Sequence, residues 1–455
     1  MTETVDSAYA AHDADSTEQL RSEIARLDRR IAWLESERAT ARRAAGALTI
    51  DEFLEPIRVR RQAADLRRAT GEPRQKVIKV VQPSGMTLPA HSPLRRVPPR
   101  KPEDMQPDYL EKYDSHTVFY DVFQSGDDIW LCGPPVSNLK EPLKKADWRV
   151  DGTDVGHAVE LNDWGRTQRS RITGEGHGRH LTLDLGSTGF SAVIAPDESD
   201  LFAGQRTIIT KSQDNDLVWI QDYLRYYHVV HGVTGVVFYD NNSTKYTPQD
   251  VADAIAQVDG ITTAVVVDWA FPFGPNGGPH KVWDSDYCQY GMLEHGHFRY
   301  LRKAAGVIST DIDELILTED ARTVFEHAAE AEQGVVAFSG VWMAKATRTP
   351  MDPHRQRRFS DYHHRVKGTT TVKWALIPAM VDDQSTQWRI HSVAGAPVAN
   401  TEKIHHRHFQ GVNNGWKYAR AETVVTPGTH TYDLRMSRVL DLVFGPSPEG
   451  SPTHP

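Results

Sequence analysis

Long hydrophobic runs are missing from this sequence of 455 residues. Its longest apolar stretches, such as residues 235–239 and 262–267, fall far short of the roughly 18 residues that cross a bilayer. Positive charge is also in deficit, because 52 Lys and Arg residues stand against 61 Asp and Glu residues, for a net charge of −9. An acidic chain repels phosphate. We therefore expect no transmembrane helix, at most peripheral membrane contact, and no nucleic-acid partner.

Cysteine is scarce, and the two that occur, Cys132 and Cys288, show no CxxC spacing. This scarcity argues against a disulfide framework and against a structural zinc site. The N-terminal residues 1–16 are acidic and lack both the positive segment and the apolar core of a signal peptide. These features predict a cytoplasmic protein, with any membrane contact at the inner face of the membrane.

A heptad pattern occupies the N-terminal region. A capping-box pair, Ser16 and Gln19, precedes it. The apolar residues that follow alternate between spacings of four and three: Leu20, Ile24, Leu27, Ile31 and Leu34. Ile at the a positions and Leu at the d positions favour parallel dimers. We predict a coiled-coil-like helical segment over residues 1–70 and a homodimer through residues 16–48, with a single amphipathic helix docked on the body of the protein as an equal alternative.

Residues 71–107 contain eight prolines and a surplus of Lys and Arg. Because proline donates no backbone hydrogen bond, we predict an extended linker that forms neither a strand ladder nor a helix. A basic tether could contact an anionic membrane surface or an anionic polymer. A solvated spacer is favoured instead, because no aromatic residue is interleaved with the charges.

Short alternating stretches fill residues 108–202. In residues 180–185, for example, Leu181, Leu183 and Leu185 share one face while Thr182 and Asp184 face water. Similar stretches lie at residues 117–123, 128–132, 148–150, 158–161 and 190–194. Repeated short strands of this kind predict a small β-sandwich, with a role in packing or in carbohydrate contact.

Strands and helices alternate between residues 203 and 432. We expect strands at 207–210, 235–239, 262–268 and 306–309, and helices at 217–230, 249–258 and 285–303. Such alternation indicates an α/β fold with a parallel sheet, in which ligands bind at the carboxyl ends of the strands. The first turn carries neither GxGxxG nor GxxxxGK[ST]. Residues 433–455 are expected to form a C-terminal tail.

Two carboxylates follow the last of these strands. Asp311 and Asp313 lie on the same side of the chain, because alternate residues share a face. Two neighbouring carboxylates repel each other unless a cation lies between them. A Mg²⁺ or Mn²⁺ ion that binds both carboxylates and bridges them to a diphosphate would remove this repulsion. The alternative is an acidic strand end that caps the next element.

Polar residues also follow other segments. Asp240 and Asn242 come after the strand at 235–239 and could hydrogen-bond a base or a ribose, although Asp and Asn also favour simple turns. Near residue 405, three histidines fall within four positions. A neutral imidazole there could complete the metal site, and Lys403 or Arg407 could neutralise phosphate. A His-rich surface loop is the alternative.

Taken in order, these segments resemble GT-A-type glycosyltransferases of the family-2-like and family-92-like groups, over about residues 204–420. The resemblance rests on NDLVWIQDYLRYYHVVHGV, FYDNNST, TDIDEL and HHRHF. It implies a GT-A, Rossmann-like nucleotide-sugar-binding domain at residues 203–432. It also implies an inverting hexosyl- or related transferase. Such an enzyme moves a sugar from a nucleotide-sugar donor to a glycan or polymer acceptor, in the synthesis of cell-surface or capsular polysaccharide.

The resemblance further implies a metal site for Mn²⁺ or Mg²⁺. By position in the family's pattern, Asp311 and Asp313 would hold the ion on the diphosphate of the donor. His408, the histidine that precedes an aromatic residue, would be the late ligand, and His406 is the alternate. The family's Asn-Glu pair is replaced here by Asn215-Asp216.

Donor and acceptor contacts are implied in the same way. Asp240 and Asn242 would lie near the nucleoside, while Lys403 and Asp311 would lie near the donor phosphates. An inverting transferase needs one carboxylate to deprotonate the acceptor hydroxyl. We choose Asp361 for this base, ahead of Glu314.

Two other functions compete with this hypothesis. A phosphatase of the haloacid-dehalogenase type also places Asp-x-Asp at a strand end, but there the motif usually comes early in the chain. A non-catalytic carbohydrate-binding or assembly protein would account for the β-rich region and the heptads. It would not need the Asp pair, His408 and Asp240 to converge.

Overall fold

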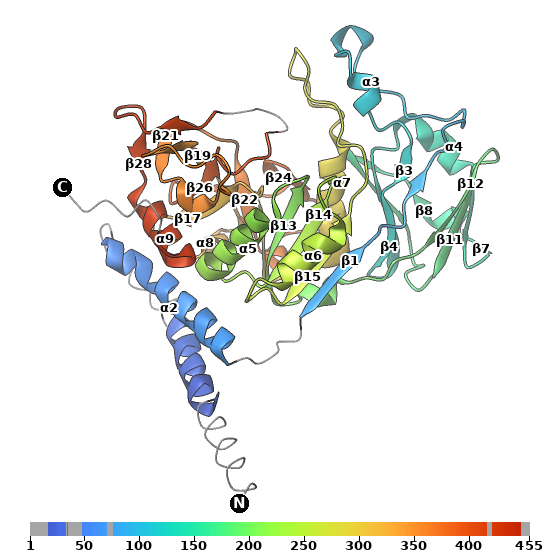
Figure 1. The fold of residues 1–455 in the computed structure, drawn as a ribbon. Helices are drawn as coiled ribbons and strands as arrows, with labels where there is room; N and C mark the ends of the chain where they lie inside the picture. The colour runs from blue at the N-terminus through green and yellow to red at the C-terminus, as the bar shows by residue number, and fades with distance from the viewer. Residues whose placement is uncertain (1–16, 33, 35–47, 71–75, 416–420, 447–455) are drawn as a thin grey trace, which may run out of the picture.

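The computed structural model describes residues 17–32, 34, 48–70, 76–415 and 421–446, which form a mixed α/β protein with several sheets. Figure 1 shows a central α/β layer with a β-rich unit on one side, a smaller sheet on the other and a helical N-terminal segment below. No helix among these residues has the length and apolar character to cross a membrane.

The central sheet has eight strands in the order β1-β15-β14-β13-β16-β22-β18-β25. The five strands from β1 to β16 run parallel to one another, and β22 is antiparallel to both of its neighbours. Their bounds, in sheet order, are Val77–Val81, Thr263–Asp268, Gly235–Asp240, Arg206–Ser212, Gly306–Ser309, Lys373–Leu376, Val335–Phe338 and Ala399–Asn400. The four strands predicted for this region are therefore confirmed.

Two hydrophobic layers cover the sheet, because alternate residues of each buried strand point to opposite faces. Ile208 and Val236 belong to the layer that contains α5 (Leu217–His231), α6 (Pro248–Ala256), α8 (Val324–Glu330) and α9 (Leu434–Phe444). Ile209 and Val237 belong to the opposite layer, which contains α7 (Tyr287–Gly296) and the π-helical turn His297–Leu301. The three predicted helices of this region are confirmed.

The strand order reverses direction beside β13. The chain runs outward from β13 to β14 and β15, and then returns through α7 to form β16 on the other side of β13. In open α/β sheets, such a switch point leaves a crevice at the carboxyl ends of the strands, where ligands bind. The crevice between β13 and β16 is therefore where the topology favours a site.

The β-rich unit consists of two antiparallel sheets around a shared core. One sheet has the order β4-β5-β10-β8, with β9 beside β10, and the other has the order β12-β11-β6-β7. From β4 to β12 the bounds are Asp121–Ser125, Asp128–Gly133, Asp147–Val150, Thr153–Asp154, Val159–Glu160, Asp163–Trp164, Thr167–Ile172, His180–Asp184 and Gly189–Val193. A smaller pair joins β2 (Met86–Thr87) to β3 (Thr117–Phe119). Strand β10 was not predicted, because its buried residues Thr167, Gln168, Arg169 and Ser170 are polar.

This unit is fixed to the α7 face of the central sheet by buried contacts. Arg169 of β10 forms an ion pair of 3.0 Å with Glu294 of α7, and both side chains are buried. The rings of Trp130 and Phe298 stack with centroids 3.8 Å apart. Arg299 also binds Asp121 of β4 at 2.6 Å. A buried charge is costly unless it is paired with good geometry, so these contacts fix the orientation in which the two units meet.

A second sheet continues from the end of β16, with the order β17-β26-β19-β21-β28. Its bounds are Glu314–Thr318, Ile404–Phe409, Gly340–Met343, His364–Thr369 and Thr431–Tyr432. Two short pairs flank it: β20 (Ala346–Thr347) with β27 (Thr423–Val424), and β23 (Gln387–Arg389) with β24 (Ser392–Ala394). Two short helices, α3 (Tyr109–Lys112) and α4 (Lys140–Lys144), lie in the loops of the β-rich side.

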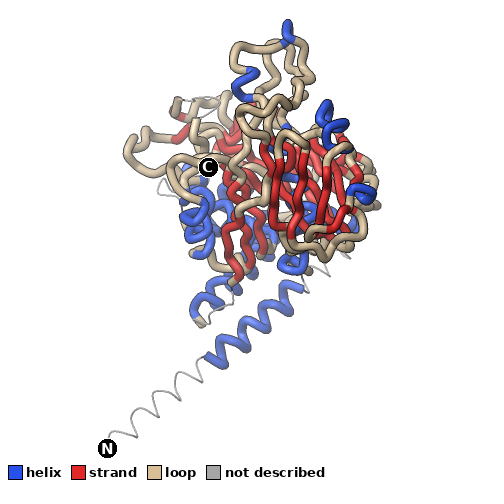
Figure 2. The backbone as a smooth tube through the Cα atoms, turned by 90° about the vertical axis from the view of Figure 1, so that its right-hand side faces the viewer, coloured by secondary structure: helices blue, strands red, loops and turns tan. Residues whose placement is uncertain are grey.

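The N-terminal segment is helical over residues 17–32 and again in α2 (Ile50–Ala69). Leu27 and Leu34 of the heptad seam pack against Val59 and Ala63 of α2. Figure 2 shows the N-terminal helix projecting away from the body of the protein. Part of the seam is thus covered within the chain. Residues 35–47 lie outside the described part, and the homodimer stays a prediction.

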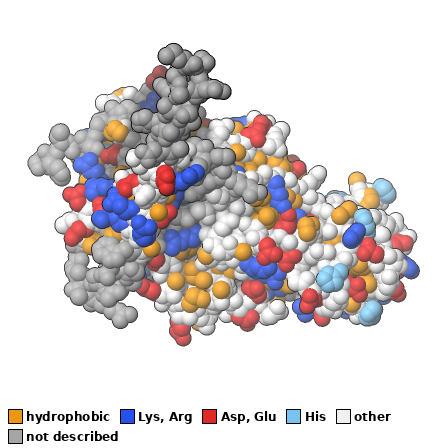
Figure 3. Space-filling view, turned by 90° about the horizontal axis from the view of Figure 1, so that it is seen from below, with side chains coloured by type: hydrophobic (Ala, Val, Ile, Leu, Met, Phe, Trp, Pro, Cys, Tyr) orange, Lys and Arg blue, Asp and Glu red, His pale blue; other side chains and the backbone are white. Residues whose placement is uncertain are grey.

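Charge on the N-terminal helices is largely paired. Arg30 lies 2.9 Å from Glu55, and Arg67 contacts Asp28. Figure 3 shows Lys and Arg side chains mixed with Asp and Glu side chains on the face seen from below.

Two expectations, one about the linker and one about the C-terminal tail, were wrong. Residues 71–107 were expected to form no ladder, yet β1 pairs in parallel with β15, since Val77–Val81 is an apolar stretch free of proline between Pro73 and Pro83. Residues 434–444, expected within a tail, form α9, whose Asp433 cap accepts a hydrogen bond from the backbone N–H of Met436.

Candidate active site

Polar side chains gather at the carboxyl ends of the parallel strands. Ser212, Asp240 and Asp268 end β13, β14 and β15 at matching positions of the ladder. On the other side of β13, the chain leaves β16 through Thr310 and Asp311. Thr210 donates a hydrogen bond of 2.8 Å to the carbonyl of Thr310 across the switch point.

A tight turn links β16 to β17. The backbone N–H of Asp311 donates to Glu314 Oε2 at 3.1 Å, and the backbone N–H of Glu314 donates to the carbonyl of Asp311 at 3.1 Å. Strand β17 then pairs antiparallel with β26, which places Glu314 opposite His408 and Ile316 opposite His406. Paired residues share a face of a sheet, so both histidines lie on the face that carries Glu314.

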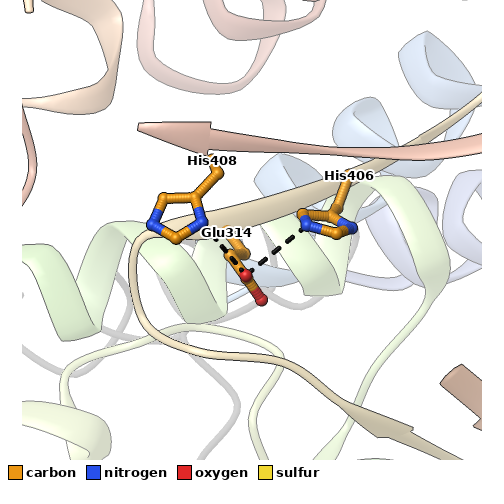
Figure 4. A group of neighbouring side chains, drawn as sticks. All are labelled: Glu314, His406 and His408. Carbon is orange, nitrogen blue, oxygen red and sulfur yellow. Dashed lines mark ion pairs between the residues drawn. The ribbon is translucent and has the colours of Figure 1, made fainter. Parts of the chain in front are cut away.

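Glu314, His406 and His408 form a compact cluster (Figure 4), in which one ligand atom from each lies within 4.8 Å of the others. Glu314 Oε1 is 3.3 Å from His408 Nδ1 and 3.5 Å from His406 Nε2. None of Glu314 Oε1, His406 Nδ1 and His408 Nδ1 makes a hydrogen bond of good geometry. Burial lowers the pKa of His406 to about 4, so this imidazole is neutral at pH 7.

Glycine at position 340 makes room for His406. A Cβ atom at Gly340 would lie 2.2 Å from His406 Nε2 and 2.3 Å from Thr370 Oγ1. The absence of a side chain lets the Thr370 hydroxyl reach His406 Nε2 at 2.5 Å. The backbone of β19 is thus part of the packing that fixes the imidazole.

Lys373, at the start of β22, joins the carboxylates of the turn. Its Nζ atom lies 2.5 Å from Asp311 Oδ2 and 3.0 Å from Glu314 Oε2. Burial opposes the charge of Lys373, but the two carboxylates outweigh it and raise the pKa of this ammonium. Burial likewise opposes ionisation of Glu314, while Lys373 and the histidines hold its pKa well below the ordinary value. Sequence reasoning missed Lys373, which precedes the apolar residues of a short strand.

Asp313 and His408 form a second pair on the more open side of the cluster. His408 Nε2 lies 3.1 Å from Asp313 Oδ2, and the Asn413 amide donates to the same carboxylate oxygen at 3.4 Å. Burial opposes protonation of His408, but Asp313 and Glu314 raise its pKa to about 10. The Trp342 ring lies 4.3 Å from the imidazole, centroid to centroid.

The predicted nucleoside-binding residues follow β14, on the other side of β13 from the cluster. Burial raises the pKa of Asp240 to about 6, with a further rise from Asp268 and an opposing hydrogen bond from Ser243. Asn242 has a positive φ of 61°, and its amide donates to the carbonyl of Phe271 at 3.1 Å. The Asn242 side chain thus links the turn that follows β14 to the loop that follows β15, where Phe271 lies.

Three of the predicted residues are not available in this crevice. Lys403 lies at the far end of β26, where its carbonyl accepts the backbone N–H of Glu319 at 2.7 Å. Asp361 is buried, and it binds Arg355 at 2.5 Å and the backbone N–H of Arg358 at 2.8 Å. Glu314 has no exposed surface. The structure thus brings Asp311, Asp313, His406 and His408 together but leaves neither chosen base open to an acceptor.

Comparisons with known proteins identify no family. No protein-family model matches the sequence, and no curated protein matches it. Among solved structures, the chain is similar to a crystal structure of S. aureus TarS at 12% sequence identity and a TM-score of 0.25. The similarity covers 52% of this chain and 39% of that chain. The structure therefore shows a mixed α/β protein with a polar cluster at the switch point of its central sheet.

Proposed function

We propose that this protein is a metal-dependent glycosyltransferase that uses a nucleotide-sugar donor. The observation that carries the proposal is the meeting of Asp313 and His408 at 3.1 Å in the switch-point crevice, with Asp240 at the end of β14, two strands away from β16. The parallel strands that meet at the switch point support the nucleotide-sugar-binding domain that the resemblance implies.

Asp313 and His408 fit a divalent ion by the chemistry of their donor atoms. A carboxylate suits Mn²⁺ and Mg²⁺ alike, and the imidazole favours the transition metal, because Mg²⁺ takes oxygen ligands. Glu314 Oε1 lies 3.3 Å from His408 Nδ1, so this nitrogen can keep its proton on the side of the carboxylate while Nε2, on the side of Asp313, would face the metal. When bound, the ion would neutralise charge on the diphosphate as it departs.

The protein's own residues supply the rest of the arrangement. Lys373 binds both Asp311 and Glu314 and offsets one of their two negative charges, which helps to keep the turn after β16 in place. Asp240 and Asn242, at the end of β14 and in the turn that follows it, would contact the nucleoside. Glu314 and Asp361 take positioning roles, because each is buried and engaged by cations of the protein.

Finer features of the proposal come from the resemblance. They are a hexosyl or related sugar, inversion at the anomeric carbon, and a cell-surface or capsular glycan as acceptor. The cytoplasmic location and the homodimer through residues 16–48 belong to the same set of proposals.

A thermal-shift screen with Mn²⁺ tests the function. Nucleoside diphosphates and nucleotide sugars are added singly, and a ligand that binds the folded state raises the melting temperature by mass action. We expect one nucleotide class to stabilise the protein and its sugar conjugate to be hydrolysed slowly. Asp313→Ala should abolish both effects without a change in fold, while Asp253→Ala, at an exposed position on α6, should keep them. Unchanged turnover in Asp313→Ala would contradict the proposal.

A further inference from the structure

One cation of the crevice has no anionic partner among the described residues. Lys211 lies near the carboxyl end of β13, paired in register with Tyr239 of β14. The ladder between β13 and β16 ends at Ile209 and Ser309, so Lys211 lies where the two strands separate. Lys211 therefore lies at the switch point itself.

The environment of Lys211 differs from that of Lys373. Lys373 contacts two carboxylates. Lys211 Nζ instead lies 4.6 Å from the centroid of the Phe273 ring, and it is in no ion pair with a described residue. A cation–π contact of this kind holds an ammonium in place without cancelling its charge.

The loop that carries Phe273 is itself anchored. Asn241 donates to the carbonyls of Trp269 and Phe271 at 2.9 Å each, and Asn242 donates to Phe271 at 3.1 Å. The aromatic partner of Lys211 is thus fixed by the same turn that follows β14. The ammonium is held ready at the crevice before any ligand arrives.

A half-buried ammonium without a counter-ion costs free energy. Burial lowers the pKa of Lys211, against the raising effects of Cys288, Asp311 and Asp240. An anionic ligand between Lys211 and the Asp313–His408 pair would recover that cost. A metal at the pair and an ammonium opposite it would together match the charge of a diphosphate.

We propose that Lys211 binds the diphosphate of the donor from the β13 side of the crevice, opposite Asp313 and His408. This inference rests on the proposed function, because the ligand is the diphosphate of that same donor. Lysine acts on phosphate as a compact point charge, so its contribution should depend on the phosphates and not on the base.

Binding measurements with Lys211→Met test the inference. The dissociation constants of UDP, GDP, ADP and CDP, and of the four matching nucleosides, are measured by calorimetry with Mn²⁺ present. We expect the preferred diphosphate to bind about tenfold to a hundredfold more weakly to Lys211→Met. The nucleoside should bind as it does to the wild type. The melting temperature of the free variant should be equal or higher, since an unpaired charge has been removed.

Two further variants complete the test. Lys211→Arg retains the charge and should keep most of the diphosphate affinity. Lys303 lies just before β16, at the opposite end of the parallel strands, where its carbonyl accepts the N–H of Gly204. The variant Lys303→Met should therefore bind the diphosphate as the wild type does. The inference is overturned if Lys211→Met binds the diphosphate normally, or if it loses nucleoside and diphosphate equally.

Failure of the proposed function would look different. A wild-type protein that binds no nucleoside diphosphate with Mn²⁺ would contradict the function itself, and the role of Lys211 with it. A wild-type protein that binds a diphosphate, loses it in Asp313→Ala and keeps it in Lys211→Met would contradict only the role of Lys211.

Discussion

Lys373 determines which partner each of the two aspartates after β16 has. The repulsion between Asp311 and Asp313 suggested a metal between them, but the ammonium of Lys373 already lies 2.5 Å from Asp311. Asp313 is instead directed to His408. The two aspartates thus have different partners, and the pair consisting of Asp313 and His408 is the one left for an ion.

Glu314→Gln tests the structural role of this carboxylate. Glu314 is fully buried between Lys373 and the two histidines, and removal of one member of a buried ion pair costs about 3–5 kcal/mol. We expect the free energy of unfolding to fall by about that amount. Urea denaturation at pH 7 measures it. Glu141→Gln, at an exposed position, serves as the control, and an equally small change in both variants would refute the role.

Asp240 should make stability depend on pH. Its pKa in the folded protein, about 6, lies above the value near 3.9 of an unfolded chain, because burial penalises the carboxylate. Asp240 therefore binds more protons in the folded state in this range, and its contribution to the free energy of unfolding should decrease as the pH rises from about 4 to about 6.

The variant Asp240→Asn isolates that effect. Its stability relative to the wild type should increase across the same pH range and then level off above pH 6. Urea midpoints at half-unit intervals give the comparison, and Asp253→Asn, at an exposed position, should follow the wild type. A constant difference between Asp240→Asn and the wild type would show that Asp240 does not titrate there.

At the scale of elements, the strands and helices of the central sheet follow from buried apolar runs and could be predicted. The second sheet could not, because β26 reads Ile-His-His-Arg-His-Phe and its polar side chains are buried or half-buried against partners far away in the sequence. Strand β10 was missed for the same reason, since Arg169 is satisfied by Glu294 of α7. Sequence periodicity detects the hydrophobic face of an element but not such pairs.

Helix α2 packs into the core of the protein. Phe53 is fully buried in the layer that contains α5 and α9, and the guanidinium of Arg435 lies 5.3 Å from its ring. Phe53→Ala should therefore lower the free energy of unfolding by about 3–5 kcal/mol in urea denaturation. Leu110→Ala, at a position that is 66% exposed, should change it by less than about 0.5 kcal/mol. A small effect at both positions would mean that α2 folds apart from the core.

For the whole molecule, the acidic balance does not prevent the binding of an anion. The net charge of −9 is spread over the entire chain, whereas Lys211 and Lys373 place two ammonium groups beside the aspartates of the candidate site. The partners of the candidate site come from β13, β16, β17, β22 and β26, which span two sheets. The sequence supplied the aspartates and histidines of this site, but only the fold revealed which of them face each other.

In the function that we propose, Asp313 and His408 hold a metal ion to which a nucleoside diphosphate binds. Calorimetric titration of the preferred diphosphate, with and without Mn²⁺, tests it most directly in the wild type, Asp313→Ala and His408→Ala. We expect Mn²⁺-dependent binding in the wild type and loss of the Mn²⁺ effect in both variants. Binding that is indifferent to Mn²⁺, or that survives unchanged in both variants, would contradict it.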